Sequence, residues 1–594
     1  MQRQRRGGLG PPFLCPLVST VFLLPGQIDP AGPYPYHRTV QPVISAQQMR
    51  EIDRLTVQDH QTSSLQLMNA AATACLQALA AHFGNELTRK KVQILCGPGN
   101  NGGDGAALAL QLSSRGVQTD VILFGIVSDS SGDARHSFEA VSQLANQSAS
   151  TSQLNFIECR DAKQWQGIAS DSCVYDVIVD ALFGIGLKRP LAGVFVNVVE
   201  YLTAKKTEQL VVDAPLILSV DLPSGLNADE ANPIGPAVAA DITVTFTAPK
   251  IANVLPPAAS LNGRLVLADI GSPQQLIAEA KSKLFLTEEK DARDFLVSTR
   301  YLPNSFKNTH GHVLVVAGSR GYTGAAVLCA NAAMRAGAGL VTVGTPVSSQ
   351  NVMATAVMPE VMTTALAETD RGSISDEAVE HVIGLMEKVD AVAIGPGISA
   401  SDERTRRFVH AVVKQRQSPI VIDADALNCL SPWPADLLGS EKAPLILTPH
   451  PGEMLRLLGS TNKFELDDRV AVTREFATRH QLILVLKGSR SLIASPDGNV
   501  CVNPTGNAGL GTAGAGDTLT GIIVAFIVQA VGTLKDKANP LAATIAALYV
   551  GGLAGDFAAS KLGMRGMVAS DIRENLSEAI RSLDRKGEQP NINQ

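Results

Sequence analysis

The sequence has few of the features that mark disulfide-rich, nucleic-acid-binding or membrane-spanning proteins. Its eight cysteines are scattered over 594 residues, without a C-x-x-C pair or the histidine spacing of a zinc site, which indicates reduced thiols in a cytoplasmic protein. Lys and Arg (50) nearly balance Asp and Glu (56), giving a formal net charge of -6, whereas nucleic-acid binding is built on excess positive charge. The sequence contains no run of about 20 uninterrupted apolar residues, which is the length needed to cross a bilayer. We therefore expect no nucleic-acid partner and no membrane partner.

Apolar residues and glycine are abundant instead. Apolar residues make up 45% of the chain, charged residues only 18%, and there are 51 glycines. At about 100–200 residues per domain, the length suits two to four domains. This composition favours a large soluble α/β enzyme with many tight turns.

Short β-branched runs alternate with longer Ala- and Leu-rich segments, and this design occurs twice along the chain. Such alternation is typical of a parallel sheet with helices on both faces, so the predicted fold class is α/β, with two three-layer α/β domains. The expected strands are Val92–Cys96, Val121–Phe124, Val177–Val179, Leu216–Val220, Ile242–Phe246, His312–Ala317, Leu340–Gly344, Ala391–Ile394, Ile420–Ile422, Leu445–Leu447 and Leu482–Leu486. The expected helices are Ala46–Gln58, Leu65–His82, Asp104–Ser114, Gly324–Ala336, Asp376–Glu387, Gly452–Leu458 and Asp517–Ala530.

Changes in composition give the expected boundaries. Arg-rich residues precede the apolar run Phe13–Leu24, as in a secretory signal, but Pro16 interrupts it and no small-x-small cleavage site follows. A disordered extension is therefore expected there, while a targeting role and a start codon placed too far upstream stay open as alternatives. The expected parts are an extension (1–42), a first domain (43–280), a linker (281–299), a second domain (300–580) and a tail (581–594).

The run from Val92 to Gly105 reads as a strand that feeds a glycine loop and then opens a helix. Glycines let the backbone approach a ligand, and free amides at a helix start favour an anion such as phosphate. Gly97, Gly99 and Gly102 match the dinucleotide-binding pattern, which is weak by itself. A NAD redox domain also needs an acid at the end of the second strand, where this chain has Gly125. The loop therefore predicts a phosphate site outside a dehydrogenase fold.

Two further strands end in carboxylates, Asp180 and Asp221, the latter followed by Ser224. Parallel strand ends meet along one edge of a sheet, so these residues are expected to meet Asn101 around one ligand. A single Asp at such an end is more often a helix cap; three ends with glycine loops favour a ligand site. Lys188 and Arg189 suit a phosphate partner, although neither spacing nor charge identifies the ligand.

Together, the stretches Gly97–Gly105, Asp180–Pro190 and Val220–Gly225 resemble the epimerase domain of the NAD(P)H-hydrate repair enzymes, over roughly residues 43–273. The resemblance implies a Rossmann-like fold, a K+ ion beside the substrate, and Asp221 as the catalytic acid or base. The K+ ligands it implies are Asn101, Asp180 and Ser224. The substrate contacts it implies are Asn100, Asn101, Gly102, Gly103, Asp104, Gly184, Ile185, Gly186, Leu187, Lys188, Arg189, Pro190 and Asp221. The chain departs from the family at Asn69, where an acidic residue is usual.

The glycine-rich stretch from Asn503 to Gly521 is the most specific signal in the chain. Its glycines crowd a loop just before an apolar helix, whose first turn holds Asp517. Such a helix start offers free N–H groups to a phosphoryl group, and the carboxylate can take or give a proton. We interpret this stretch as a phosphoryl-transfer site.

The Gly-Ala-Gly-Asp core of that loop resembles the ribokinase-like fold. Taken with five neighbouring motifs, it looks like the dehydratase domain of the same repair family, over about residues 300–576; the motifs are Gly318–Ala325, Ile394–Gly397, Val421–Asn428, Thr448–Glu453 and Leu486–Ser491. The resemblance implies phosphorylation of the hydrate's hydroxyl group followed by elimination, with Asp517 catalytic and Mg2+ accompanying ADP or ATP. The substrate contacts it implies are Ala325, Gly397, His450 and Asp517. The nucleotide contacts it implies are Lys487, Gly488, Ser489, Arg490, Ser491, Asn507, Ala508, Gly509, Leu510, Gly511, Thr512, Ala513, Gly514, Ala515 and Gly516.

In the second site, some histidines have more than one possible role, and some residues differ from the family pattern. His450 either contacts substrate or caps the helix that follows it. His310 and His312 would share a face if both were extended, but no third metal ligand is apparent, so Mg2+ carried by the nucleotide phosphates is favoured over a protein metal cage. The family usually has Ser-His-Lys-Gly where this chain has Ser305–Asn308. In addition, Ala515 lacks a hydroxyl that is often present, and Ser491 replaces Thr.

The leading hypothesis is a bifunctional enzyme that interconverts the R and S hydrates of NAD(P)H and dehydrates the S form at the expense of ADP or ATP. Its expected partners are the hydrates NADHX and NADPHX and ADP, and a homo-oligomer is expected. One alternative is a small-molecule kinase of the ribokinase-like superfamily with an appended nucleotide-binding domain. Another makes the first half a nucleotide-sensing or scaffolding module without turnover. Turnover measurements separate the three.

Overall fold

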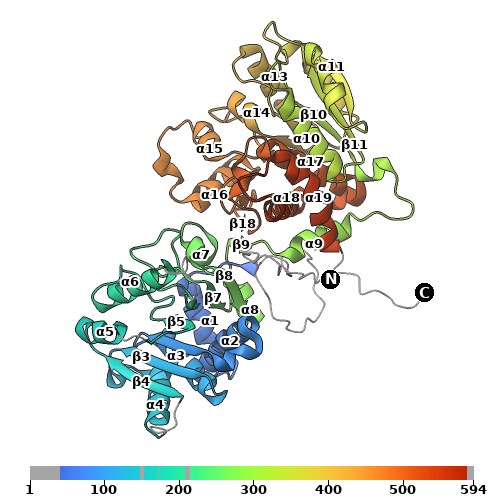
Figure 1. Ribbon diagram of the computed structural model, residues 1–594. Coiled ribbons are helices and arrows are strands. Elements are labelled where there is room, and N and C mark those ends of the chain that lie inside the picture. Colours follow the sequence, from blue (N-terminus) through green and yellow to red (C-terminus); the bar gives the residue numbers. More distant parts are fainter. Residues whose placement is uncertain (1–40, 148–152, 171–172, 208–213, 585–594) are drawn as a thin grey trace, which may run out of the picture.

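The chain folds around two sheets, each in its own lobe (Figure 1). The computed structural model describes residues 41–147, 153–170, 173–207 and 214–584, so the calls on residues 1–40 and 585–594 lie outside the described part. The first sheet contains β2 (Lys91–Cys96), β3 (Gln118–Phe124), β4 (Leu154–Cys159), β5 (Val177–Ala181), β6 (Leu216–Val220), β7 (Ile242–Phe246) and β8 (Arg264–Ala268). Its helices are α1 (Ala46–Asp59), α2 (Ser64–Phe83), α3 (Asn100–Ser114), α4 (Gly132–Gln147), α5 (Ala162–Ala169), α6 (Val194–Thr207), α7 (Ile251–Val254) and α8 (Gln274–Glu279).

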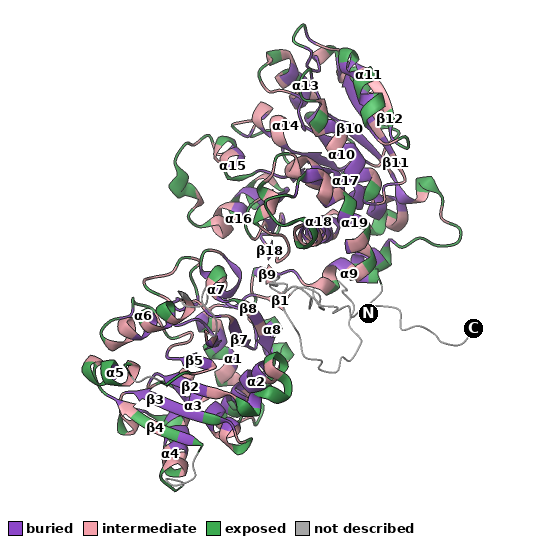
Figure 2. Cartoon of the chain, in the orientation of Figure 1, coloured by how far each residue is buried: buried purple, intermediate pink, exposed green. Residues whose placement is uncertain are grey.

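The first sheet is parallel throughout, in the order β4-β3-β2-β5-β6-β7-β8. The order reverses between β2 and β5, which is the doubly wound, Rossmann-like arrangement in which ligands bind beyond the strand ends at the switch point. Alternation of side chains explains its two cores: Ile94 of β2 packs under α2, α3 and α4, whereas Leu95 packs on the side of α5 and α6. Both residues are fully buried, and the central strands of this sheet are coloured mostly as buried (Figure 2), so a parallel sheet with helices on both faces follows from the apolar run.

The second sheet is larger and carries an antiparallel edge. Its order is β1-β9-β18-β17-β16-β15-β14-β13-β10-β11-β12, parallel from β16 to β12 and reversing between β13 and β10. The strands are β1 (Gln41–Pro42), β9 (Leu284–Leu286), β10 (His312–Val316), β11 (Leu340–Pro346), β12 (Met362–Leu366), β13 (Ala391–Ile394), β14 (Ile420–Ile422), β15 (Leu445–Leu447), β16 (Ile483–Leu486), β17 (Leu492–Ala494) and β18 (Val500–Val502). The helices are α9 (Glu289–Ser298), α10 (Thr323–Arg335), α11 (Val347–Ala356), α12 (Val379–Met386), α13 (Glu403–Lys414), α14 (Ala424–Cys429), α15 (Pro451–Leu457), α16 (Arg469–His480), α17 (Ala515–Leu534), α18 (Pro540–Leu562) and α19 (Ala569–Asp584).

The predicted fold class of two three-layer α/β domains is confirmed, and each expected strand is present. The strands that sequence patterns missed are at or near sheet edges. In β4 and β12 the apolar pattern is broken because polar side chains face solvent, and β17 and β18 are only three residues long. The central strands are predicted by fully buried apolar runs, and β4 and β12 lack such a run.

The expected linker 281–299 is wrong. Its residues form β9 and α9, and β9 joins the second sheet beside β18. From α9, Ala292, Phe295 and Leu296 are buried in the core under α17 and α18, whereas Lys290 and Asp294 lie on the exposed face of this amphipathic helix. Gln41 and Pro42, assigned to the extension, pair with β9 as β1. Residues 581–584, assigned to the tail, end α19.

Two helices of the second domain are long and apolar enough to cross a membrane, Ala515–Lys537 and Pro540–Leu562. The structure accounts for that character in another way, because 72% of the first apolar window and 61% of the second are buried inside the protein. Both helices contribute to the core beneath β10 and β13. They are core helices of an α/β domain.

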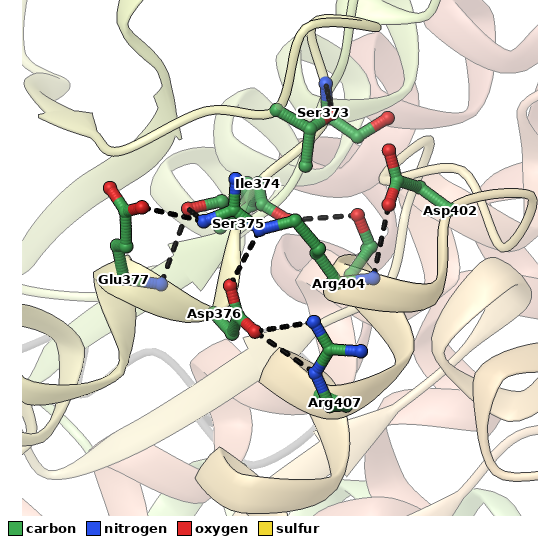
Figure 3. Close-up of polar contacts among 10 residues, drawn as sticks. Ser373, Ile374, Ser375, Asp376, Glu377, Asp402, Arg404 and Arg407 are labelled. Atoms are coloured by element: carbon green, nitrogen blue, oxygen red, sulfur yellow. Dashed lines mark hydrogen bonds and ion pairs between the residues drawn. The ribbon is translucent and has the colours of Figure 1, made fainter.

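Ion pairs join α13 to the short 3-10 helix η6 (Asp376–Ala378) on the surface of the second domain (Figure 3). Arg404 Nε donates to Asp376 Oδ1 at 2.8 Å, and Arg407 Nη2 donates to Asp376 Oδ2 at 2.8 Å. These two guanidinium groups hold the pKa of Asp376 below its usual value. The network fixes how α13 lies against η6, which is a structural role.

Two candidate active sites at the carboxyl ends of the sheets

In the first domain, glycines bring the loop after β2 against the loop after β5. A Cβ on Gly97 would lie 2.0 Å from the carbonyl oxygen of Leu182, and one on Gly102 would lie 1.8 Å from the carbonyl oxygen of Gly97. Gly99 precedes α3 without a side chain to cap it, so the first N–H groups of the helix face the switch point. The glycine pattern thus allows close backbone contact and leaves the first N–H groups of α3 without a side-chain cap, while anion binding there stays a prediction.

Asp180 and Ser224 form a buried polar cluster beside this loop. Ser224 Oγ donates to Asp180 Oδ1 at 2.6 Å, and Ser219 Oγ donates to Asp180 Oδ2 at 2.8 Å. Ser224 Oγ also accepts a hydrogen bond from the Phe183 N–H at 2.9 Å. Burial raises the pKa of Asp180, and the hydrogen bonds from Ser224 and Ser219 partly offset that rise. The cluster fixes the backbone at the start of the loop that contains Gly184.

Asn101 and Asp221 converge on the other side of that loop. A Cβ built on Gly184 would lie 2.9 Å from Asn101 Oδ1 and 3.3 Å from Asp221 Oδ2. The Nδ2 group of Asn101 is buried without a hydrogen-bond partner, which is costly unless a ligand completes it. The structure therefore gathers Asn101, Asp180, Asp221 and Ser224 around residues 183–184. Of the rest of this loop, Ile185 and Leu187 are half-buried, whereas Gly186, Lys188, Arg189 and Pro190 are exposed.

Asp221 is held in an unusual conformation and paired with a lysine that sequence patterns missed. Its φ of +64° lies in the left-handed region, which non-glycine residues adopt at a cost and which is concentrated at functional sites. Lys250 Nζ, only 1% exposed, donates to Asp221 Oδ1 at 2.5 Å. Lys250 lies 29 residues after Asp221, beyond β7, and no spacing rule connects the two.

Two helical carboxylates add to the negative charge around Asp221. Burial raises the pKa of Asp53 on α1 to about 6, with Lys250 lowering it and Asp221 raising it. Burial also raises the pKa of Asp104 on α3 well above its usual value, and the charges of Asp221 and Asp53 add to the rise. Asp104 was predicted and Asp53 was missed. Perturbed carboxylates beside an open helix start are typical of an acid–base site.

In the second domain, a cavity of about 420 Å³ opens between the β16–β17 loop and the start of α17. Residues from α18 and α19 close its far side, including Leu548, Gly552 and Ile572. The predicted nucleotide contacts that line it are Lys487, Gly488, Ser489, Arg490, Ser491, Asn507, Ala508, Leu510, Gly511, Ala515 and Gly516. The predicted contacts outside its lining are Gly509, Thr512, Ala513 and Gly514. The size suits a nucleotide-sized ligand.

The start of α17 has the same construction as that of α3. Gly514, with a φ of +84°, precedes the helix and provides no side-chain cap, so the first N–H groups of α17 are open beside the cavity. Asp517 lies in this first turn, where burial raises its pKa to about 6, Asp423 raises it further and Lys487 lowers it. A carboxyl group that titrates near neutrality next to free helix N–H groups can exchange a proton while a phosphoryl group is held.

Lys487 belongs to a buried charge network as well as to the cavity wall. Its Nζ lies 2.7 Å from Asp423 Oδ1 and 3.8 Å from Glu453 Oε2. Thr520 Oγ1 donates to Asp423 Oδ2 at 2.6 Å. Although burial acts to raise the pKa of Asp423, Lys487 and the hydroxyl groups hold it below its usual value. A Cβ on Gly516 would lie 3.3 Å from Lys487 Nζ, so the glycine loop touches this network. Asp423, Glu453 and Thr520 were not predicted as site residues.

His450 forms the cap that was one of its two expected roles. Its Nδ1 accepts hydrogen bonds from the N–H groups of Gly452 (3.0 Å) and Glu453 (3.4 Å) at the start of α15. Burial, with the charges of Lys487 and Arg456, lowers its pKa, so the ring is neutral at pH 7. Its Nε2 side lies 3.5 Å from Glu453 Oε1, with about half of the side chain exposed, so substrate contact stays a prediction.

The remaining predicted substrate contacts lie at the switch point of the second sheet. Gly397 has a φ of +64°, and a Cβ there would lie 2.6 Å from the carbonyl oxygen of Tyr322 and 3.1 Å from Cβ of Ala325. Ser319 Oγ donates to the carbonyl oxygen of Gly397 at 2.8 Å. The loops after β10 and β13 are thus tied together, and Ala325 and Gly397 are neighbours; their contact with substrate stays a prediction.

The two histidines at the start of β10 do not share an ion. His310 ends a 3-10 helix, η5 (Lys307–His310), and stacks on the ring of Tyr301 at a centroid distance of 3.6 Å. His312 instead lies within 2.8 Å of Thr342 Oγ1 through its Nε2 atom. His310 and His312 would share a face only in extended backbone, and they do not, because the chain turns at Gly311, with a φ of +76°. Among the described residues, no cluster of three His, Cys, Asp or Glu side chains could hold a metal ion.

Two doubly wound domains, each with an uncapped helix start beside a buried carboxylate, define a two-site enzyme that binds phosphate-bearing ligands. Residues 313–578 match the family described as NAD(P)H-hydrate dehydratase, and residues 64–252 match the YjeF-related protein N-terminus. The chain belongs to the family of bifunctional NAD(P)H-hydrate repair enzymes.

Relatives in that family align over nearly the whole chain. The bifunctional NAD(P)H-hydrate repair enzyme of Moorella thermoacetica is 38% identical over 92% of this chain and 98% of its own length. The enzyme of Thermofilum pendens is 33% identical over 91% of this chain and 96% of its own length. Among solved structures, an ADP/ATP-dependent NAD(P)H-hydrate dehydratase from Bacillus subtilis, co-crystallised with ATP and Mg2+, is 29% identical. That match covers 50% of this chain and 97% of the other, with a TM-score of 0.42.

Proposed function

We propose that this chain repairs hydrated NAD(P)H in two steps: its first domain interconverts the R and S hydrates, and its second dehydrates the S form at the expense of ADP or ATP. One observation carries the proposal. The same construction, a helix start that follows a glycine, has no side-chain cap and lies beside a buried carboxylate, is present in both domains, at α3 and at α17. Two reactions on one phosphate-bearing metabolite need two such sites. A chiral dehydratase pocket accepts one epimer, so the other must be converted first.

In the first site, the start of α3 holds the phosphate groups of the hydrate and Asp221 handles the proton. Residues 100–104 supply N–H groups and residues 184–190 form the facing loop, with Lys188 and Arg189 exposed for phosphate contact. Asp221 Oδ2 faces this space beside Asn101 Oδ1. In this proposal Asp221 accepts the proton of the hydroxyl group and returns it after the carbon that bears this group has inverted.

In the second site, the nucleotide occupies the 420 Å³ cavity with its terminal phosphate at the start of α17. Asp517 takes the proton from the hydroxyl group of the hydrate as the oxygen bonds to the terminal phosphorus, and the phosphoanhydride bond breaks so that the nucleotide leaves with one phosphate fewer. The C–O bond then breaks with its electron pair leaving on phosphate, and loss of a ring proton restores the dihydropyridine. Phosphate is a far better leaving group than hydroxide, which explains why a phosphoanhydride is consumed.

Two cations complete the proposal. The predicted K+ ligands Asn101, Asp180 and Ser224 fit a monovalent cation, because their oxygens surround residues 183–184 and the buried Asp180 carboxylate has only hydroxyl and N–H partners among the described residues. The ion would neutralise Asp180 and support the substrate loop. In the second domain, Mg2+ would arrive with the nucleotide and neutralise its phosphates. The buried carboxylates Asp423 and Glu453 near Lys487 are oxygen donors of the kind that Mg2+ accepts.

Removal of potassium tests the first cation. We expect replacement of K+ by a tetraalkylammonium salt at equal ionic strength to slow epimerisation by about tenfold or more, because Asp180 would lose its counter-ion. Dehydration of the S hydrate by the same preparation is the control and should change by less than about twofold. Equal epimerisation rates in the two salts would contradict the K+ assignment.

The rate of dehydration should depend on pH through Asp517. The carboxylate must be ionised to accept the hydroxyl proton, and its pKa is raised to about 6. The value of kcat/KM should therefore be level above about pH 7 and fall about tenfold per pH unit below about pH 6. Glu453, whose pKa burial raises to about 7, titrates nearby, so the profile is compared with that of Glu453→Gln. An acidic limb near pH 4 would contradict the role of Asp517.

The alternative of a small-molecule kinase is separated by following the product. Purified chain is incubated with the S hydrate and either ADP or ATP, and the near-ultraviolet absorbance of dihydronicotinamide is recorded. Recovery of that absorbance supports the proposed function, and the two nucleotides identify the donor. A phosphorylated product without recovery would favour a kinase with an appended nucleotide-binding domain.

Two further expectations remain part of the proposal. A cytoplasmic location is consistent with the cysteines of the described residues, all of which are free thiols. A homo-oligomer is tested by light scattering of the purified chain.

A further inference from the structure

A buried lysine faces the proposed base of the first site. The Lys250 ammonium donates to Asp221 Oδ1 at 2.5 Å, to Thr245 Oγ1 at 2.9 Å and to the carbonyl oxygen of Phe246 at 3.1 Å. All three of its protons are therefore used, and its side chain is 1% exposed. Burying a lysine without a charge partner is costly, so this residue and Asp221 require each other.

The pairing leaves one oxygen of Asp221 for chemistry. Lys250 and Thr245 Oγ1 both donate to Oδ1, whereas Oδ2 points toward Gly184 and lies near Asn101 Oδ1. The left-handed backbone at Asp221 turns the carboxylate into this position. One oxygen is thus fixed to the protein interior and the other faces the substrate loop.

Lys250 itself is fixed by the elements around it. The backbone N–H of Lys250 donates to Asn253 Oδ1 at 2.9 Å, and Asn253 Nδ2 donates to Asn262 Oδ1 at 2.9 Å. Lys250 directly precedes α7, and Val254 and Leu255 at the end of that helix are buried in the core of the second domain. The lysine cannot move away from Asp221 without disturbing this packing.

The groups that face Asp221 from other elements are mostly acidic. Asp53 lies on α1, Cys75 on α2 and Asp104 on α3, and each interacts electrostatically with Asp221. Lys250 is the cation that offsets this acidic surround. Without it, Asp221 Oδ1 would lose its cation partner and keep the acidic neighbours.

We propose that Lys250 is a positioning residue of the epimerase site, whose ammonium holds Asp221 Oδ1 so that Oδ2 accepts and returns the hydroxyl proton of the hydrate. This proposal rests on the proposed function of the first domain. In the step concerned, the O–H bond of the hydrate breaks and its proton moves to Asp221 Oδ2, while the oxygen forms a carbonyl group and the neighbouring ring C–N bond breaks with its electron pair staying on nitrogen. The nitrogen then adds to the opposite face of that carbonyl group, which inverts the centre, and the proton returns to the oxygen.

The test compares Lys250→Met with Lys206→Met in the full-length chain. Lys206 forms a second lysine–aspartate pair in the same domain, with Nζ 2.8 Å from Asp241 Oδ1, but Asp241 lies just before β7, at the opposite end of the strands. Conversion of the R to the S hydrate is followed by chromatography without nucleotide. Dehydration of the S hydrate with ADP or ATP reports that the chain is folded.

We expect Lys250→Met to lower the kcat of epimerisation about 100-fold, with KM within about twofold. Lys206→Met should leave kcat within about twofold of the wild type. An equal loss in both variants, or a rise in KM without a fall in kcat in Lys250→Met, would overturn the proposal. If Lys250→Met does not fold, Lys250→Arg takes its place: kcat should fall while KM stays within about twofold, and an unchanged kcat would overturn the proposal. Absence of epimerisation by the wild type would instead refute the proposed function.

Discussion

Replacement of Asp221 by Asn should abolish epimerisation and spare dehydration. Asn is close to Asp in shape but cannot take a proton, so we expect the R hydrate to be converted about 1,000-fold more slowly. The S hydrate should still be dehydrated at the wild-type rate because Asp517 lies on a different sheet. The measurement is chromatographic separation of the two epimers over time, corrected for spontaneous epimerisation.

Asp241→Asn provides the matched control. Asp241 also pairs with a lysine, and it also accepts a hydrogen bond from a backbone N–H group, that of Ile217 at 2.9 Å. Its replacement removes a similar charge from the same domain and should leave epimerisation within about threefold of the wild type. A first domain that only senses or scaffolds would show equal rates for the wild type, Asp221→Asn and Asp241→Asn.

Replacement of Asp517 by Asn should abolish dehydration and spare epimerisation. The hydroxyl proton would have no acceptor, so the expected loss in kcat is about 1,000-fold. Binding of ADP or ATP should persist, because the cavity wall and the N–H groups at the start of α17 are unchanged. Absorbance assays measure turnover, and calorimetric titration measures nucleotide binding.

Stability gives this variant an internal check. Burial raises the pKa of Asp517 above that of an exposed Asp, so the ionised carboxylate costs folding free energy at neutral pH. Asp517→Asn should therefore unfold at the same temperature as the wild type or higher, which excludes unfolding as the cause of lost activity. Asp402→Asn, at the cap of α13, is the matched control and should keep full turnover. Rapid dehydration by Asp517→Asn would refute the assigned role.

The sequence predicts the parts of the sites that lie within one motif. Gly97 and Gly102 predict a close approach of the backbone, and the structure shows a close backbone contact at both residues. The loop around Asp517 predicted a helix start with free N–H groups, and α17 begins after Gly514 without a side-chain cap; phosphate binding there stays a prediction. These features are local, because a glycine loop and the helix after it are adjacent in the chain.

Contacts between distant segments were not predictable in the same way. Lys250 pairs with Asp221 because β6 and β7 are neighbours in the sheet and the chain turns back after β7. Asp423 meets Lys487 because β14, β15 and β16 are consecutive in the second sheet. Strand order is needed to see either pair. Likewise, the polar and charged residues of α9 predict a linker, whereas its apolar residues are packed into the core.

Separation of the two sites explains how one chain handles a mixture of epimers. Asp221 and Asp517 lie on different sheets with different cores, so each pocket can fit one geometry of the ligand. The second domain alone would consume only one epimer at the enzymatic rate. The first domain makes the rest of the pool available to it.

The central claim is tested most directly by the fate of an equal mixture of R and S hydrates. Wild-type chain with ADP or ATP should convert the entire mixture to dihydronicotinamide nucleotide, whereas Asp221→Asn should pause at about half and then follow the spontaneous rate. Addition of Asp517→Asn to that stalled reaction should restore complete conversion. Wild-type conversion that stops at half, or that regenerates no dihydronicotinamide, would contradict a chain with two repair sites.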